Sequence, residues 1–80
     1  MKNLEIAQIF EDMADILEIK NVQWKPQAYR RAARGITNSE DVEEIYKKGG
    51  IKALEDIPGV GERLAQKIIE YINTGKIHEY

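Results

Sequence analysis

The chain has 80 residues, a formal net charge of −2 at pH 7 and no cysteine. This length allows one small domain, residues 1–80, and the lack of cysteine excludes disulfides and thiolate zinc sites as sources of stability. The slight negative charge excludes a strongly basic domain that coats nucleic acid along its length. No run reaches the roughly 18 apolar residues of a membrane span, and acids interrupt the N-terminal segment where a signal peptide is apolar. We therefore expect a cytoplasmic monomer with no membrane partner.

The charges are distributed unevenly along the chain. Residues 1–19 carry five acids and one lysine, whereas residues 20–34 carry five basic residues and no acid. The folded molecule should therefore have a negative side and a positive side.

The first half of the chain predicts two helices. From Asn3 to Glu18, apolar residues recur at three- and four-residue spacing and form one stripe for the core: Ile6, Ile9, Phe10, Met13, Ile16 and Leu17. Proline favours a break over residues 21–26 and a second helix from Pro26 to Gly35. The buried face of this second helix is small, and consists of Ala28, Ala32, Ala33 and Ile36. Its outward face is basic, with Arg30, Arg31 and Arg34.

The second half predicts three shorter helices. Ser39 is the expected N-cap of a helix with acids in its first turn and lysines in its last, and Gly49 and Gly50 end it. A short helix follows over residues 51–57, and the last helix runs from Glu62 to Asn73 with Gly75 as its terminator. No period-two alternation predicts a strand. The expected fold is all-α, a compact bundle of about four to five short helices.

The turn IPGVG, residues 57–61, joins the last two of these helices. Gly59 and Gly61 are free to adopt positive φ, and Val60 between them can anchor the turn by pointing inward. A helix N-terminus leaves about four N–H groups unpaired. Glycines in the turn before it have no Cβ in the way, so a phosphate can approach these groups. Such a pair of helices is a helix-hairpin-helix, here over about residues 51–73, which grips a nucleic-acid strand without reading its sequence. A purely structural turn is the alternative.

Two stretches carry a family resemblance. WKPQAYRRAARGI and LEDIPGVGERLAQKIIEYINTGK, with the spacing between them, resemble the N-terminal domain of family X DNA polymerases in its beta-like, microbial form. The resemblance covers nearly the whole chain and implies the N-terminal fragment of a longer polymerase. It implies DNA as the partner, bound at the 5′-phosphate of gapped or nicked DNA during base excision repair. Some family members also act as 5′-deoxyribose phosphate lyases, in which a lysine amine forms a Schiff base with the sugar.

The resemblance assigns roles to residues of the lyase site. Lys67 matches the Schiff-base nucleophile, an amine that must be neutral to react, and Tyr29 matches a supporting tyrosine beside it. Lys25 and Arg63 match residues that contact the 5′-phosphate. Trp24 matches an aromatic residue that stacks on a template base. Without the resemblance, Lys67 would be read as a solvated helix lysine and Trp24 equally well as a core tryptophan.

Further contacts are expected along the hairpin and the basic helix. The N–H groups of Gly59, Gly61 and Arg63 are expected to face phosphate, and Arg30, Arg31 and Arg34 extend the positive side. The carbonyl groups of Glu55, Ile57 and Val60 match a family site for Na⁺ or K⁺, and no other cofactor is required. The acids Asp12, Asp15 and Glu18 and the lone His78 are read as solvated surface rather than as a metal or catalytic site.

Two short stretches depart from the family pattern. Glu55 and Asp56 stand where lysines precede the hairpin, and residues 78–80 stand where a further basic residue is expected. Each phosphate contact that is lost weakens DNA binding and its salt dependence. Two alternatives to a lyase therefore stay open. One is a non-catalytic helix-hairpin-helix module, and the other is a protein-interaction bundle whose arginine-rich helix meets an acidic partner.

Overall fold

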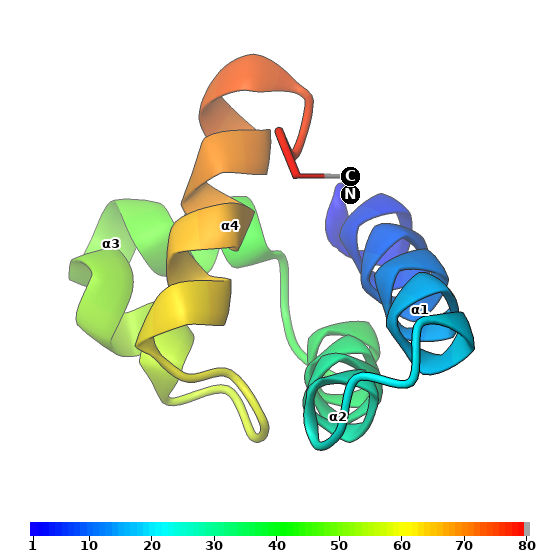
Figure 1. Ribbon diagram of the computed structural model, residues 1–80. Coiled ribbons are helices and arrows are strands. Elements are labelled where there is room, and N and C mark those ends of the chain that lie inside the picture. Colours follow the sequence, from blue (N-terminus) through cyan, green and yellow to red (C-terminus); the bar gives the residue numbers. More distant parts are fainter. Residues whose placement is uncertain (80) are drawn as a thin grey trace.

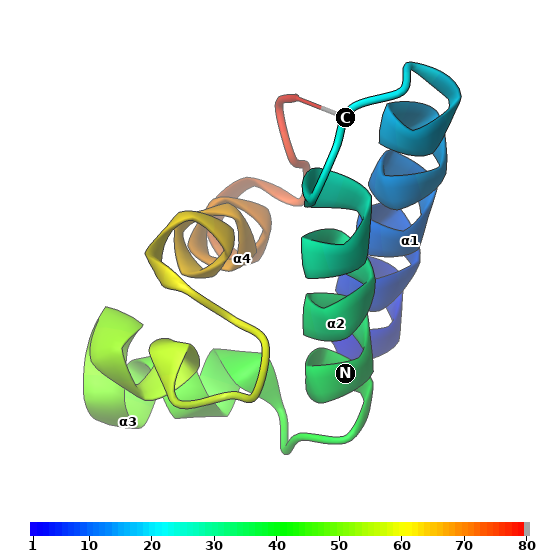
Figure 2. The same cartoon turned by 60° about the horizontal axis from the view of Figure 1, so that its bottom comes forward.

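The computed structural model describes residues 1–79, which form four helices and no strand. The helices are α1 (Asn3–Ile19), α2 (Lys25–Thr37), α3 (Val42–Glu55) and α4 (Glu62–Thr74). Figures 1 and 2 show α1 and α2 side by side as one antiparallel pair, with α3 and α4 packed together beside it. The predicted all-α fold is confirmed. None of the helices in residues 1–79 is long and apolar enough to cross a membrane.

The predicted core stripe of α1 is largely buried against α2. Ile6, Phe10 and Met13 are buried, and Ile9 and Leu17 pack against the core from its edge. Ile16 is predicted in the core but is exposed, although its neighbour Leu17 still packs against the core. In the last turn of α1 the buried stripe therefore continues through Leu17 and excludes Ile16.

The buried face of α2 contains one residue that differs from the prediction. Ala32, Ala33 and Ile36 are buried as predicted, but Ala28 is exposed and Tyr29 takes its place in the core. Tyr29 lies four residues before Ala33 and seven before Ile36, at the centre of the buried face, whereas Ala28 lies at the edge of that face. The ring of Tyr29 meets Phe10 of α1 edge to face, with centroids 5.4 Å apart.

The start and the middle of α3 differ from the predicted helices. Asp41, not Ser39, is the N-cap, and its carboxylate accepts the Glu43 N–H at 3.0 Å. The hydroxyl of Ser39 instead donates to the Ile36 carbonyl at 3.0 Å. Gly50 has φ 69° and ψ −160°, so it kinks α3 into two helical pieces. These pieces correspond to the two short helices predicted on either side of the glycine pair.

A buried asparagine ties the start of α1 to the connection between α2 and α3. Asn3 is 1% exposed, and its side-chain N–H₂ donates to the carbonyls of Ile36 at 3.1 Å and Glu40 at 2.8 Å. Its side-chain oxygen accepts the N–H of Val42 at 3.0 Å. One side-chain amide therefore gives the buried Val42 N–H its partner and adds a donor to two carbonyls of the connection.

The hairpin turn lies directly against α2 (Figures 1 and 2). A Cβ added at Gly35 of α2 would come within 1.9 Å of the Pro58 carbonyl oxygen, and one added at Gly59 within 2.8 Å of the Arg31 carbonyl oxygen. Gly59 has φ 86°, whereas Gly61, also expected to use positive φ, is extended with φ −92°. Val60 is buried as predicted. Two glycines thus set how closely α2 and the turn approach.

We predict that Gly35→Ala destabilises the domain. Alanine normally stabilises a helix interior relative to glycine, but its methyl group would overlap the Pro58 carbonyl oxygen. Overpacking of this kind should lower the free energy of unfolding in urea by about 2 to 3 kcal/mol. Gly61→Ser is the control, because its Cβ meets nothing within 4 Å and serine is a favoured N-cap. Unchanged or increased stability of Gly35→Ala would contradict the close approach.

Asn3→Ala is expected to lower the free energy of unfolding by about 2 to 3 kcal/mol, because the buried Val42 N–H loses its partner and the bonds to the Ile36 and Glu40 carbonyls are lost. Urea unfolding monitored by circular dichroism measures the change. The matched control is Gln8→Ala on the same helix, whose exposed amide donates to Asp12. This control should stay within about 0.5 kcal/mol of the parent, and equal effects of the two substitutions would show that Asn3 has no special role.

Candidate nucleic-acid interface

Four of the predicted site residues lie around one cavity between α2 and α4. Lys25 and Tyr29 come from the first turns of α2, and Arg63 and Lys67 come from α4. The cavity has a volume of about 280 Å³ and is completed by Ala28, Leu64 and Glu79. The exposure of Ala28 has its explanation here, since that face of α2 forms a wall of the cavity. Tyr29 and Lys67, 38 positions apart in sequence, therefore share one site.

Lys67 is largely enclosed and already has a partner. Its side chain is 12% exposed, and its amine forms an ion pair with the carboxylate of Glu79, which is 64% exposed. The hydrogen bond and charge of Lys67 lower the pKa of Glu79 below its ordinary value, with smaller contributions from Arg63 and Lys25. Glu79 is therefore an anion at neutral pH. Sequence reasoning noted an acid where a base was expected, but nothing in the local pattern paired it with Lys67.

Tyr29 lines the same cavity with most of its ring in the core. Burial raises the pKa of its phenol, and the negative charge of Glu79 adds to that rise. The positive charges of Lys67 and Arg63 act in the opposite direction but do not cancel it. Tyr29 is thus a neutral hydroxyl at pH 7, able to donate one hydrogen bond to a group in the cavity.

The hairpin turn presents backbone N–H groups at the start of α4. The first hydrogen bond within this helix runs from the Ala65 N–H to the Gly61 carbonyl at 2.9 Å, so residues 62–64 have no acceptor inside the helix. No side chain caps this end. Gly59 and Gly61 are exposed, while Ile57 and Val60 anchor the turn in the core. A Cβ at Gly61 would meet nothing within 4 Å, so an anion can approach this end of α4 closely.

The three arginines of α2 lie in different surroundings. Arg30 points towards α1, where its guanidinium pairs with Asp15 at 2.8 Å and Glu18 at 3.3 Å. These two acids are therefore ion-paired rather than simply solvated, and they offset the charge of Arg30. Arg31 and Arg34 are exposed and line a hollow of about 310 Å³ together with Pro58 and Gly59 of the hairpin turn. Only these two arginines extend the positive face beside the turn.

Trp24 lies outside the core. It is 79% exposed, with φ 73°, and it immediately precedes Lys25 at the start of α2. It lines a shallow surface hollow with Gln23 and Pro26. The structural alternative of a core tryptophan is wrong, and the indole is available to a partner next to the lysine cavity.

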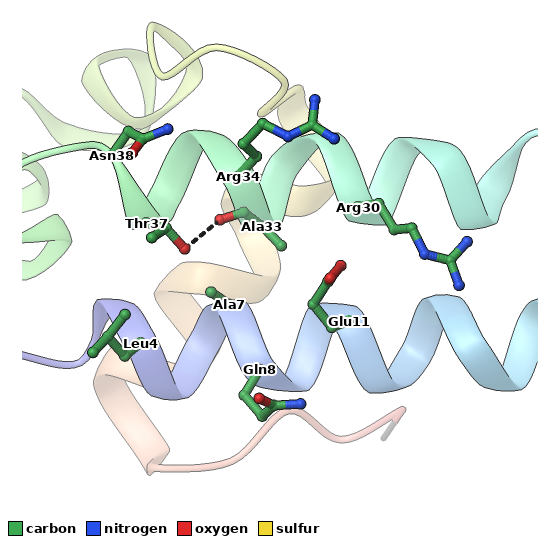
Figure 3. Close-up of a pocket in the computed structure, with 9 residues that line it drawn as sticks. All are labelled: Leu4, Ala7, Gln8, Glu11, Arg30, Ala33, Arg34, Thr37 and Asn38. Atoms are coloured by element: carbon green, nitrogen blue, oxygen red, sulfur yellow. Dashed lines mark hydrogen bonds between the residues drawn. The ribbon is translucent and has the colours of Figure 1, made fainter.

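A separate groove runs between α1 and α2 (Figure 3). The close-up shows Glu11 extending from α1 towards α2, whereas Arg34 extends from α2 away from α1. Arg30 and Arg34 both contribute to the lining of the groove. One carboxylate oxygen of Glu11 is buried and has no hydrogen-bond partner in the described chain. Within residues 1–79, no group of histidine, aspartate and glutamate side chains is arranged to hold a metal ion. This groove contains neither the hairpin turn nor the lysine cavity.

Two comparisons bear on this arrangement. The model of the helix-hairpin-helix domain family matches residues 1–77. DNA polymerase lambda from Rattus norvegicus is 25% identical over 77 residues, which make up 96% of this chain and 13% of that protein. The chain thus spans a small part of the relative's length. Because the family match covers nearly all of the four helices and the glycine turn, the chain belongs to the helix-hairpin-helix domain family.

Proposed function

We propose that this domain binds gapped or nicked DNA at a 5′-phosphate, without sequence specificity. Helix-hairpin-helix domains bind DNA, and contacts to phosphates position a protein without reading bases. The observation that carries the proposal is the convergence of Lys25, Arg63 and Lys67 on one cavity beside the hairpin turn. Three cations in one enclosed site suit a terminal phosphate, which carries up to two negative charges near pH 7.

The hairpin turn would hold the strand next to that end. Its free N–H groups suit one internucleotide phosphate, and Arg31 and Arg34 suit its neighbours along the backbone. Trp24, exposed beside Lys25, offers a surface on which an unpaired base can stack. A Na⁺ or K⁺ ion at the carbonyls of Glu55, Ile57 and Val60 belongs to the same proposal. The Ile57 carbonyl accepts the Val60 N–H at 3.0 Å and keeps a second lone pair for such an ion.

The whole protein is proposed to be a family X DNA repair polymerase, of which residues 1–80 form the N-terminal domain. The similarity to a polymerase over 77 residues supports this assignment. Nucleotidyl transfer would then belong to a part of the protein outside this sequence. The DNA-binding role of the domain does not depend on that assignment, because the cavity and the turn both lie within residues 1–79.

A 5′-deoxyribose phosphate lyase reaction is the proposed chemistry of the cavity. The neutral amine of Lys67 would add to the C1′ aldehyde of the sugar, and loss of water would give an iminium ion. Removal of a C2′ proton would then let the 3′ C–O bond break, so that the DNA 5′-phosphate leaves. The hydroxyl of Tyr29, which lines the same cavity, would donate a hydrogen bond to the sugar.

A non-catalytic DNA-binding module is the second candidate, and one observation favours it. The amine of Lys67 is paired with Glu79, and an ammonium ion held by a carboxylate is suited to contacting phosphate rather than to attacking an aldehyde. The two candidates share the DNA-bound arrangement and differ only in whether Lys67 forms a covalent bond.

We predict that Arg31→Ala weakens DNA binding whereas Arg30→Ala changes it little. Arg31 is exposed beside the turn, so its loss should remove about one phosphate contact and reduce the slope of log K against log salt by about 1. Arg30 carries the same charge on the same helix but is held by Asp15 and Glu18. Fluorescence anisotropy with gapped DNA at several salt concentrations measures both variants. Equal effects at the two positions would contradict the assigned interface.

Sodium borohydride trapping on a 5′-deoxyribose phosphate substrate tests the chemistry. We expect a covalent adduct with the parent protein and with Lys76→Ala, an exposed lysine outside the cavity, and none with Lys67→Ala. Absence of any adduct at saturating DNA would leave only the non-catalytic module. An adduct that persists in Lys67→Ala would place the nucleophile at another amine.

A further inference from the structure

The segment after α4 turns back towards the lysine cavity and is anchored just before it. Gly75, with φ 78°, ends α4 and reverses the chain. The side chain of Ile77 is buried in the core, and the N–H of His78 donates to the carboxylate of Glu70 at 2.9 Å. Ile77 and His78 therefore hold the backbone in place immediately before Glu79 (Figure 2, where this segment is red).

Beyond these anchors, Glu79 places a carboxylate at the rim of the cavity. It pairs with Lys67, and the cavity brings Lys25 and Arg63 around the same space. The amine is on the enclosed side, at 12% exposed, and the carboxylate is on the open side, at 64%. The only acid among the seven residues that line this cavity thus lies between the lysine and solvent.

We propose that Glu79 is an internal competitor for the DNA 5′-phosphate, which occupies the anion position of the cavity and covers Lys67 until DNA displaces it. This inference rests on the proposed function and adds its regulation. A carboxylate brings one negative charge to the three cations, whereas a terminal phosphate brings up to two. Replacement of the Glu79 carboxylate by the phosphate therefore strengthens the electrostatic attraction in the cavity, and the released carboxylate is hydrated.

Displacement requires little movement of the fold. Glu79 lies one residue beyond the His78 N–H anchor, so its side chain can swing away while Ile77 and His78 keep their contacts. Because the carboxylate of Glu79 is largely open to water, its pairing with Lys67 is screened, and the competition should lower affinity by a modest factor. DNA without a 5′-phosphate binds through the hairpin turn and does not compete with Glu79.

The test compares Glu79→Gln with the control Glu40→Gln, which makes the same change in charge. Glu40 lies in the connection between α2 and α3, whereas Lys25 of the cavity is at the opposite end of α2. Anisotropy titrations use gapped DNA with either a 5′-phosphate or a 5′-hydroxyl. Glu79→Gln should bind the phosphorylated DNA about two- to fivefold more tightly than Glu40→Gln does. The two variants should bind the hydroxyl DNA equally. Equal or weaker binding of the phosphorylated DNA by Glu79→Gln would overturn the proposal.

A second measurement needs no DNA. Formaldehyde with cyanoborohydride methylates lysine amines through an iminium ion, and mass spectrometry of peptides gives the rate at Lys67. This rate should rise about two- to fivefold in Glu79→Gln relative to Glu40→Gln, with Lys76 as the internal reference. An unchanged rate would overturn the competitor role whatever the DNA result. A faster methylation of Lys67 in Glu79→Gln, with no preference of any variant for phosphorylated DNA, would show that Glu79 covers Lys67. In that case the proposed binding of the 5′-phosphate would be wrong.

Discussion

The close approach of α2 to the hairpin turn is the constraint on which the rest of the structure depends. Gly35 and Gly59 leave no room for a Cβ between the two backbones, so the turn is seated directly on α2. This contact fixes the start of α4 relative to α2. The cavity between Tyr29 and Lys67 and the hollow beside Arg31 are both consequences of it, because each has one wall from α2 and the other from the hairpin or the helix that follows it.

The same helix, α2, divides its charges among three surroundings. Lys25 enters the lysine cavity, Arg30 pairs with acids of α1, and Arg31 and Arg34 flank the turn. A chain with a net charge of −2 can therefore present a cationic surface, since the acids of α1 lie on a different face. The pairing of Arg30 with Asp15 shows that a basic residue on the outward face of α2 can be neutralised by a neighbouring helix.

The lysine cavity combines features that favour binding with one that opposes it. The cations and the neutral hydroxyl of Tyr29 suit a phosphorylated sugar, whereas Glu79 offsets part of the positive charge. Local charge balance, rather than the presence of Lys67 alone, would thus decide how strongly a phosphate is held. The exposed Trp24 lies at the start of the same helix as Lys25, so stacking and phosphate contacts can act on the same strand end.

The sequence by itself determined the helices, the glycine turn and, through the family resemblance, four of the residues that line the lysine cavity: Lys25, Tyr29, Arg63 and Lys67. Helix periodicity and turn chemistry depend on neighbours within a few positions, so they can be read along the chain. Only the tertiary structure decided which partner each polar group takes: Asn3 with the backbone near Val42, Arg30 with Asp15, and Glu79 with Lys67. These contacts join elements that are distant in sequence, and no local pattern specifies them. Their geometry depends on how the two helix pairs pack. Gly35 and Gly59 set this packing through the contact between α2 and the turn, and that contact is visible only in the folded chain.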